Sequence, residues 1–373
     1  MSSNNNLILV LFGGSPFEMP FVNKVKAILN MFLPGQAGGE AIRRLIFGLS
    51  NPCGKLSETW MKKTDFIYNH LQYSSKHVEN YIENIYVGYR YYDEVPDKIL
   101  FPFGFGLSYS NFLYSSLNIE RKSNYINVSF LLTNNSNIDG KEIVQLYVGR
   151  NTNSSVFKAK KELKAYKKVF LKAHESKVVT LSFDVEETAY FNTLLDEFVV
   201  ENGEYPIYVC SSSQDIALKG TIELSGYKTV DNPYSQEVIN AYKNIKDEKI
   251  IDESIFMSTI NSSQVNEPSK TPFTMETPIA DFITTKSGKF VYNILMKVVA
   301  GKSKVSRKEK DEAIINQALK NQRFTMILVP KNSLRSLLQS SGGMLQFNLA
   351  KALLELANGH FFKCLKYLFK KEK

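Results

Sequence analysis

The sequence predicts a multidomain α+β protein made of a partial α/β fragment, a β-sandwich and a helical C-terminal tail. Three observations support this prediction. The first 60 residues contain strand, loop and helix signals but too few strands for a parallel sheet buried on both faces. The middle of the chain contains short apolar runs separated by turn signals, and the last third repeats apolar residues at helical spacing. We therefore place three domains at residues 1–99, 100–225 and 226–373.

The composition is that of a folded protein in a reducing compartment. Of the 373 residues, 43% are hydrophobic and 12% aromatic, which is enough for two or three cores. The three cysteines, Cys53, Cys210 and Cys364, lie far apart without the spacing of a metal site, so we expect free thiols. The apolar run at residues 7–12 follows no positive charge and is too short for an export signal or a membrane span. We therefore expect a cytoplasmic protein without a transmembrane segment.

The net charge of +9 is concentrated in the last third of the chain. Residues 286–310 hold eight basic residues against one acidic residue, and residues 359–373 hold five lysines against one glutamate. Basic stretches bind nucleic acid or anionic membranes in some proteins. Here the lysines are spaced along amphipathic helices instead of gathering with arginines and aromatic residues. We therefore expect solvated helix faces and no nucleic-acid partner.

The N-terminal region is predicted to run strand, loop, helix, loop and helix. Residues 7–12 have the length of a buried strand, and the Gly-Gly-Ser-Pro sequence after them is a turn signal. Residues 20–32 are expected to form a helix, with Pro20 in its first turn and apolar residues on one face. A glycine-rich loop at residues 35–39 precedes a short helix through residues 41–46. This loop lacks the glycine spacing of nucleotide-binding motifs, so we predict no nucleotide cofactor.

Residues 100–112 are predicted to connect the α/β fragment to the sandwich. Gly104 and Gly106 alternate there with three Phe and a Leu, so the backbone can turn while apolar side chains anchor both sides. Upstream, residues 86–93 add four tyrosines and one arginine around Gly88. Both stretches have the composition of a buried seam, and we expect a hinge there.

The middle region has the strand spacing of a β-sandwich. Asn202-Gly203 is a hairpin signal between two of its runs. The predicted strands are residues 126–132, 142–148, 162–171, 177–183, 198–200, 205–210 and 216–224.

Several charged residues of this region are expected to face solvent. His174 lies in a polar turn, which favours an exposed loop histidine over a proton shuttle. A row of lysines along one strand edge is also predicted to be solvent-facing. These are Lys158, Lys160, Lys161, Lys164, Lys167 and Lys168.

The last third is predicted to be helical. Asn232-Pro233 opens a helix over residues 234–245, and residues 262–278 have the composition of a linker or an ordered strap. Helical stripes follow within residues 291–298, 314–319 and 345–356. His360 has no second ligand in its vicinity, so we predict no metal site there.

A final apolar stripe lies at the end of the chain, opposite lysines. Such a stripe occurs in helices at membrane interfaces, but docking against the rest of the protein is favoured. Its members are Phe361, Phe362, Leu365, Leu368 and Phe369.

The first 109 residues contain four characteristic blocks, at residues 34–42, 47–48 with 51–56, 86–93 and 101–109. In this order they resemble the closing blocks of glycoside hydrolase family 3, which includes β-glucosidases and β-xylosidases. The first two resemble the end of the family's α/β sandwich domain, and the last two its exit into a fibronectin type III-like, immunoglobulin-like domain. Two positions depart from the family pattern, Cys53 and Asn84.

The same resemblance continues along the chain. Residues 139–148, 161–164 and 203–205 are similar to the family's fibronectin type III-like module. Residues 333–362 resemble the helical extension of certain bacterial members. The resemblance thus implies the same three-part organisation as the residue patterns.

Hydrolysis of a glycoside requires two carboxyl groups, which lie about 5–5.5 Å apart in a retaining enzyme. The resemblance implies that the family's nucleophile lies on its barrel domain and its acid/base residue in the barrel or in earlier parts of the sandwich domain. No position of this chain matches either motif. Four carboxylates near the matching blocks, Glu18, Glu40, Glu58 and Asp93, are interpreted as helix-start charges or partners of Arg90, Arg43 or Arg44. We therefore assign no catalytic, cofactor-binding or metal-binding residue and expect no cofactor.

The resemblance implies the C-terminal part of a β-glucosidase-like enzyme that hydrolyses O-glycosyl bonds in carbohydrate metabolism. We expect it to be inactive without a barrel domain, so its implied partner is a barrel half in trans, with β-linked sugars as substrates of the complemented enzyme. The alternative is a non-catalytic module that binds carbohydrate or protein, or has a structural role. We also expect residues 1–60 to have an unusually apolar surface and to be mobile when the chain is alone.

Overall fold

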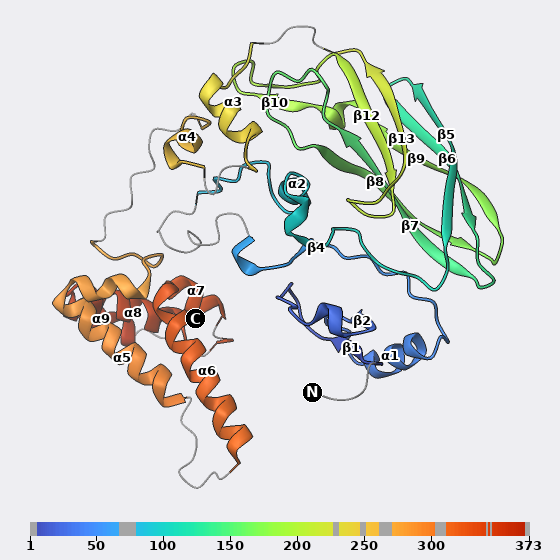
Figure 1. The fold of residues 1–373 in the computed structure, drawn as a ribbon. Coiled ribbons are helices and arrows are strands. Elements are labelled where there is room, and N and C mark those ends of the chain that lie inside the picture. The colour runs from blue at the N-terminus through green and yellow to red at the C-terminus, as the bar shows by residue number, and fades with distance from the viewer. Residues whose placement is uncertain are drawn as a thin grey trace. The chain divides into compact units, whose positions relative to one another are not determined.

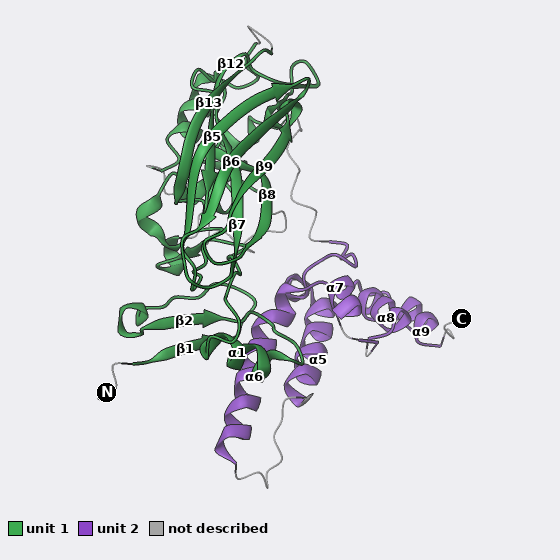
Figure 2. Ribbon diagram, turned by 90° about the vertical axis from the view of Figure 1, so that its right-hand side faces the viewer, with its two compact units in different colours: residues 1–71, 80–262 green, residues 72–79, 263–373 purple. Residues whose placement is uncertain are grey.

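The computed structural model describes residues 6–66, 80–226, 231–246, 251–260, 271–302, 311–340, 342–343 and 345–369 (Figure 1). The chain divides into two compact units (Figure 2). The first comprises residues 1–71 and 80–262, and the second comprises residues 72–79 and 263–373. The mixed α and β architecture and the helical C-terminal part agree with the predicted fold class.

The first unit begins with a small parallel sheet. Strand β1 (Ile8–Leu11) pairs with β2 (Ala27–Asn30), so that Ile8 lies opposite Ala27 and Leu11 opposite Asn30. Among the described residues this sheet has two strands, β1 and β2. The 3₁₀ helix η1 (Val22–Lys24) lies between them, and helix α1 (Gly38–Ile46) follows.

The helix expected over residues 20–32 is therefore wrong. Its apolar residues fit a helical stripe, but Val22, Val25 and Ile28 are β-branched and favour extended backbone. Val22 and Ile28 pack instead against a small core of Leu11, Met19 and Trp60. Pairing with β1 together with this burial outweighs the 3.6-residue periodicity.

Short elements lead from this sheet to the sandwich. Strand β3 (Trp60–Met61) pairs antiparallel with β4 (Ile99–Phe101), which places Trp60 opposite Phe101. Between them in sequence lie the 3₁₀ helices η2 (Thr64–Phe66) and η3 (Pro96–Lys98) and helix α2 (Tyr89–Tyr92).

The β-sandwich is the largest part of the first unit, and its predicted strands are confirmed (Figure 1). One sheet has the strand order β5-β6-β9 and the other β13-β12-β7-β8. Side chains of both sheets meet in one core, which includes the fully buried Phe130, Leu146 and Ile207. The strands are β5 (Phe112–Lys122), β6 (Tyr125–Asn134), β7 (Gly140–Gly149), β8 (Lys161–Leu171), β9 (Ser176–Asp184), β12 (Gly203–Cys210) and β13 (Ile216–Leu224).

Strand β5 was absent from the predicted strands because a bulge interrupts its alternation. The pairing with β6 shifts between Ser115 and Asn118, and Ser116 has a positive φ of 57°. Before the bulge Phe112 and Tyr114 face the core, and after it Leu117 and Ile119 do. A search for strict alternation across this stretch therefore fails.

The remaining elements of the first unit pack around one end of the sandwich. The 3₁₀ helix η4 (Val185–Thr188) has a capping box formed by Asp184 and Glu187, and a hairpin of β10 (Tyr190–Asn192) and β11 (Glu197–Val199) follows. Helix α3 (Gln236–Lys243) buries Tyr242 beside Tyr86, and α4 (Glu253–Met257) begins at the N-cap residue Asp252.

The second unit consists of helices around a core that contains Phe273, Phe282 and Leu334. Within it, the Asn358 side chain bonds both backbone groups of Phe273, at 2.8 and 2.9 Å. The part of residues 262–278 that the structure describes is therefore an ordered strap, and residues 262–270 lie outside the described residues. The elements are η5 (Ile279–Thr284), α5 (Lys286–Lys302), α6 (Glu312–Lys331), α7 (Leu334–Ser340), α8 (Phe347–Ala357) and α9 (Phe361–Leu368).

Helix α9 docks through a different face from the one that its sequence favours. Cys364 is buried, whereas Phe361, Phe362 and Phe369 of the final stripe are exposed. The prediction that this helix docks on its own protein is confirmed by its packing on α8, but the phenylalanines of the predicted stripe are not the residues that it buries. Among those residues no helix combines the length and the apolar character that a membrane crossing requires.

Candidate functional site

The predicted hinge at residues 100–112 is a firmly bonded seam. The amide of Gly104 donates to the Leu56 carbonyl, and the amide of Leu56 donates to the Phe105 carbonyl, both at 2.8 Å. A Cβ atom on Gly106 would lie 2.0 Å from the carbonyl oxygen of Gly54, so the two backbones approach too closely for any side chain. The alternating glycines are thus explained by close approach, and the stretch is held on both sides.

Asn51 ties this seam to the sandwich with four hydrogen bonds. Its Nδ2 donates to Ser110 Oγ at 2.8 Å and to the Asp139 carbonyl at 2.9 Å. Its Oδ1 accepts from Ser108 Oγ and from the Tyr109 amide, both at 2.9 Å. Both donors and both acceptor positions of the amide are thereby used, which fixes the orientation of the side chain.

A buried polar cluster extends the seam into the sandwich. Gln145 on β7 donates to the Gly104 carbonyl at 3.1 Å and to the Ser211 carbonyl at 2.8 Å, and it accepts from the Tyr147 hydroxyl at 2.7 Å. Nearby, Lys55 Nζ lies 2.9 Å from Glu142 Oε1. Burial raises the pKa of Glu142, and the Lys55 ammonium opposes that shift.

Asp93 forms a second buried ion pair, with Lys161 on β8. Lys161 Nζ lies 2.6 Å from Asp93 Oδ2, and Gln214 donates to the other carboxylate oxygen. Burial raises the pKa of Asp93, against the pull of Lys161. The prediction that Asp93 pairs with an arginine is wrong, because Arg90 instead contacts Glu162, with Nε and Oε1 3.0 Å apart.

The prediction that a row of lysines faces solvent is wrong for half of its members. Lys161 is buried against Asp93, Lys164 lies 3.0 Å from Glu162, and Lys158 lies 3.2 Å from Glu201. Two other segments cover these lysines. Helix α2 covers the start of β8, where the Tyr89 hydroxyl accepts a hydrogen bond of 2.9 Å from the Leu163 amide, and carbonyls of η4 accept from Lys158 and Lys164. The outer members behave as predicted: Lys160, Lys167 and Lys168 are exposed.

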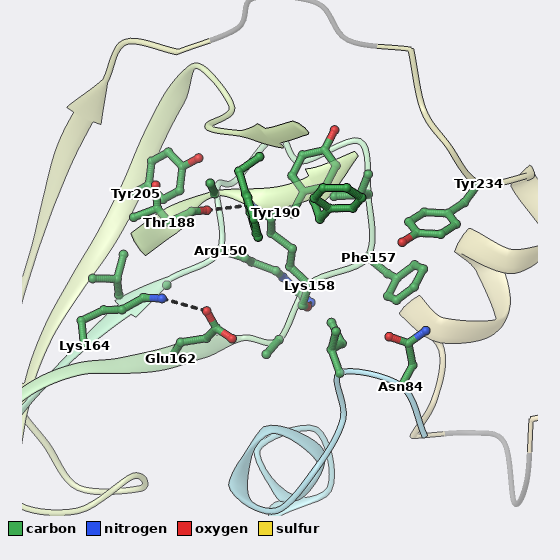
Figure 3. Close-up of a pocket in the computed structure, with 18 residues that line it drawn as sticks. Asn84, Arg150, Phe157, Lys158, Glu162, Lys164, Thr188, Tyr190, Tyr205 and Tyr234 are labelled. Atoms are coloured by element: carbon green, nitrogen blue, oxygen red, sulfur yellow. Dashed lines mark hydrogen bonds and ion pairs between the residues drawn. The ribbon is translucent and has the colours of Figure 1, made fainter. Parts of the chain in front are cut away.

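A cavity of about 310 Å³ lies beside these ion pairs, within the first unit (Figure 3). The close-up shows Lys164 and Glu162 on one wall, with Phe157 and Tyr234 across the cavity from them. Lys158 donates to the Thr188 carbonyl at 3.2 Å and lies 5.1 Å from the Tyr190 ring centre, and burial lowers its pKa.

The cavity offers aromatic surfaces and charges that already neutralise one another. Lys158 is paired with Glu201, and Lys164 and Arg90 share Glu162. Burial opposes ionisation of Glu162, but Lys164 and Arg90 outweigh it and hold its pKa below the ordinary value. Glu162 is the carboxylate among the lining residues, so the cavity lacks the two facing carboxyl groups that glycoside hydrolysis requires.

The other carboxylates singled out from the sequence lie apart from this cavity. Glu40 lies in the first turn of α1, 2.7 Å from Arg43, as predicted. Glu18 accepts a hydrogen bond of 2.6 Å from the Thr64 amide, and burial raises the pKa of Glu58. None of these contacts gives a carboxylate a catalytic role. That this chain carries no catalytic, cofactor-binding or metal-binding residue remains a prediction.

The histidines and cysteines also have structural surroundings. His174 is exposed, as predicted, and its Nε2 lies 2.8 Å from Asn137 Oδ1. His360 Nδ1 lies 2.8 Å from Glu355 Oε2, and the three cysteines are unpaired. Within the described ranges, no three His, Cys, Asp or Glu side chains are grouped as metal ligands.

Comparisons with known proteins match two segments of the chain. The model of the glycosyl hydrolase family 3 C-terminal domain matches residues 1–109, and that of the fibronectin type III-like domain matches residues 142–213. The thermostable beta-glucosidase B of Acetivibrio thermocellus is 44% identical over 227 residues, which are 59% of this chain and 30% of the relative. An exo-alpha-(1->6)-L-arabinopyranosidase of Bifidobacterium breve is 38% identical over 229 residues, which are 60% of this chain and 30% of the relative.

Two solved structures of beta-glucosidases are also similar to this chain. DesR, a beta-glucosidase from Streptomyces venezuelae solved with D-glucose, has a TM-score of 0.57 and 35% identity. That match covers 60% of this chain and 29% of DesR. A GH3 beta-glucosidase from Bifidobacterium adolescentis also has a TM-score of 0.57 and 35% identity, over 65% of this chain and 37% of its own. The chain thus spans about 30% of the length of the curated relatives that it matches.

Proposed function

We propose that this chain, which belongs to glycoside hydrolase family 3 and carries the C-terminal portion of such a protein, is the non-catalytic half of a β-glucosidase-type enzyme. In this proposal a barrel half supplied in trans brings the catalytic carboxyl groups, and the substrates of the assembled enzyme are β-linked sugars. The chain described above completes the α/β domain and holds it against the sandwich.

The observation that supports this proposal most strongly is the open α/β fragment. Its parallel sheet has two strands among the described residues, whereas parallel sheets are normally larger and covered on both faces. Leu33 and Phe47 are 79% and 74% exposed. Leu7, Ile8, Phe12, Phe17, Ile46 and Leu49 are exposed as well, as expected for a fragment whose neighbours come from elsewhere.

The seam gives the open fragment a fixed position on the sandwich. Asn51 and the Lys55–Glu142 pair connect residues of the fragment to β7 and to the loop before it. A partner that binds the open sheet would therefore meet the fragment in one orientation, with little ordering still to be done on binding.

The test is complementation. The full chain is co-expressed with the part of the A. thermocellus relative that precedes the matched region, and hydrolysis of an aryl β-glucoside is measured. The matched region of the relative itself, co-expressed with the same barrel half, shows that such a split enzyme can assemble. We expect a complex and turnover with this chain, and no turnover by either half alone.

Matched variants locate the contact. Leu33→Asp with Phe47→Asp should abolish complex formation, because both place a charge on the proposed interface. Val178→Asp changes an equally exposed apolar residue on β9 and should leave the complex intact. If the relative's own halves assemble while this chain gives neither complex nor turnover, the proposal is wrong.

We also propose a cytoplasmic location. The cysteines support it, since Cys53, Cys210 and Cys364 are all free thiols, as is usual in a reducing compartment. Fractionation of the source cells with an antibody to the chain tests this location.

A further inference from the structure

Helix α9 presents two faces of different character. Cys364 is the buried residue of the helix, and α9 packs on α8. Phe361, Phe362 and Phe369 are 56%, 85% and 83% exposed. At about 100° per residue these three phenylalanines and Leu365 fall within one arc, and Cys364 falls outside it. Helix α9 thus packs on α8 through the face that carries Cys364, and the face that carries the three phenylalanines is exposed.

The exposed arc is bordered by positive charge. Lys366 and Lys363 are exposed on the same helix, about 40° and about 100° beyond Phe362 in the helical projection. From residue 361 to residue 373 the sequence contains five lysines and one glutamate, a net charge of +4.

This combination selects one kind of partner. An aromatic arc bordered by lysines is the pattern of a helix that lies in the interface of an anionic membrane, with its rings among the lipid head groups and its lysines beside the phosphates. A nucleic acid would use the lysines but would leave the phenylalanine arc in water. A protein partner needs no excess of lysine on one border of an apolar face.

We propose that α9 binds the surface of anionic lipid bilayers, inserting Phe362 and Phe369 at head-group level. These two residues are seven positions apart, about 10 Å along the helix, so both ends of the arc can enter one interface. Lys363 and Lys366 supply the electrostatic attraction. This inference is independent of the proposed enzyme function, because it rests on the second unit alone.

The experiment uses the full chain and two kinds of vesicle. One consists of phosphatidylcholine, and the other contains phosphatidylglycerol as well. In a co-sedimentation assay we expect binding to the anionic vesicles, loss of that binding at high salt, and little binding to phosphatidylcholine alone. Phe362→Ser with Phe369→Ser should weaken binding to the anionic vesicles by about tenfold or more.

A matched control is available in the same unit. Phe324 on α6 is 65% exposed, and Phe324→Ser should leave vesicle binding unchanged. Circular dichroism of each variant verifies that the helices are retained. Lys363→Glu with Lys366→Glu should abolish the preference for anionic vesicles.

Three results would overturn the proposal. One is the absence of binding to anionic vesicles, and another is unchanged binding by the double serine variant. The third is a dimer that dissociates in the double serine variant without any vesicle binding, which would identify a second copy of the chain as the occupant of the arc.

Discussion

The β-sandwich and the N-terminal α/β fragment belong to one compact unit, but they bury their apolar residues very differently. In the sandwich, two sheets cover each other, and side chains such as Phe130 and Leu146 are almost completely removed from water. In the fragment, a two-stranded sheet and one helix leave large apolar residues exposed. Family resemblance covers both regions, so sequence similarity alone does not show which of them is structurally self-sufficient.

The difference suggests that the sandwich supports the fragment. The small core around Trp60 contains few residues, whereas the seam contains buried ion pairs and a fully bonded asparagine. We infer that the fragment keeps its fold in the isolated chain chiefly through the seam. The following predictions test that inference, beginning with the largest expected effect.

Truncating a core side chain of the sandwich should lower the free energy of unfolding far more than truncating an exposed side chain of the fragment. Phe130→Ala is expected to lower the free energy of unfolding by about 3–5 kcal/mol, because it removes a large buried ring and leaves a cavity. Leu33→Ala in the fragment should change that free energy by less than about 0.5 kcal/mol. Urea denaturation followed by circular dichroism measures both. Similar losses for the two variants would contradict the comparison.

Breaking the buried pair between Asp93 and Lys161 should come next. Asp93→Ala leaves the ammonium of Lys161 buried without its carboxylate, so we expect a loss of about 3 kcal/mol in the free energy of unfolding. Adding Lys161→Met removes the unpaired charge and should restore part of that loss. A double variant as unstable as the single variant would show that the pairing itself is not the cause.

Loosening the Asn51 amide should have a smaller and more local effect. Asn51→Ala removes four hydrogen bonds, and the free energy of local opening is expected to fall by about 1–2 kcal/mol. Hydrogen exchange should rise in residues 47–56 and stay unchanged in the sandwich core. Asn51→Asp keeps the acceptor but loses both donors, so its exchange should lie between those of the wild type and Asn51→Ala.

Acid titration should reveal opposite contributions from two glutamates. The pKa of Glu162 is held below 4.5, so its contribution to stability is present above pH 4.5 and is lost as the pH falls through its folded-state pKa. The pKa of Glu142 is raised above 4.5, so its contribution is present below that value and is lost as the pH rises through its folded-state pKa.

The two glutamine variants separate these contributions. In urea titrations across the acid range, Glu162→Gln should reduce the loss of stability below pH 4.5. Glu142→Gln should remove the loss of stability that ionisation of Glu142 causes as the pH rises above 4.5. Equal slopes in the wild type and both variants would contradict the assigned directions.

How far the sequence predicts this structure depends on how local each determinant is. Strands β12 and β13 were predictable because their alternation lies within a few residues. The hairpin predicted at Asn202-Gly203 is wrong, because β11 pairs with β10 and Gly203 already lies in β12, opposite Leu224. The second strand of the parallel sheet was misassigned, because Ile28 and Leu29 fit a helical stripe and only their pairing with β1 decides otherwise. Strand β5 was missed because one bulge reverses its alternation.

The seam was located from the sequence, but its contacts were not. Glycines at positions 104 and 106 indicated close approach, and the structure shows the approaching groups to be Gly54 and Gln145. The pairing of Asp93 with Lys161 connects residues 68 positions apart, and no local pattern marks it. The lysines beside β8 gave a misleading signal, since their partners lie in distant segments: Asp93 at the end of α2, Glu201, and carbonyls of η4.

The hydroxyl of Tyr89 has a consequence for how copies of this protein meet. Strand β8 lies at the edge of its sheet, where unpaired backbone groups can recruit a strand from another molecule. Tyr89 occupies the Leu163 amide, and its ring is held between Phe103 at 4.9 Å and Tyr147 at 5.8 Å. Helix α2 therefore also blocks intermolecular strand addition at the start of this edge, and its release would lengthen the stretch of β8 that is open to another molecule.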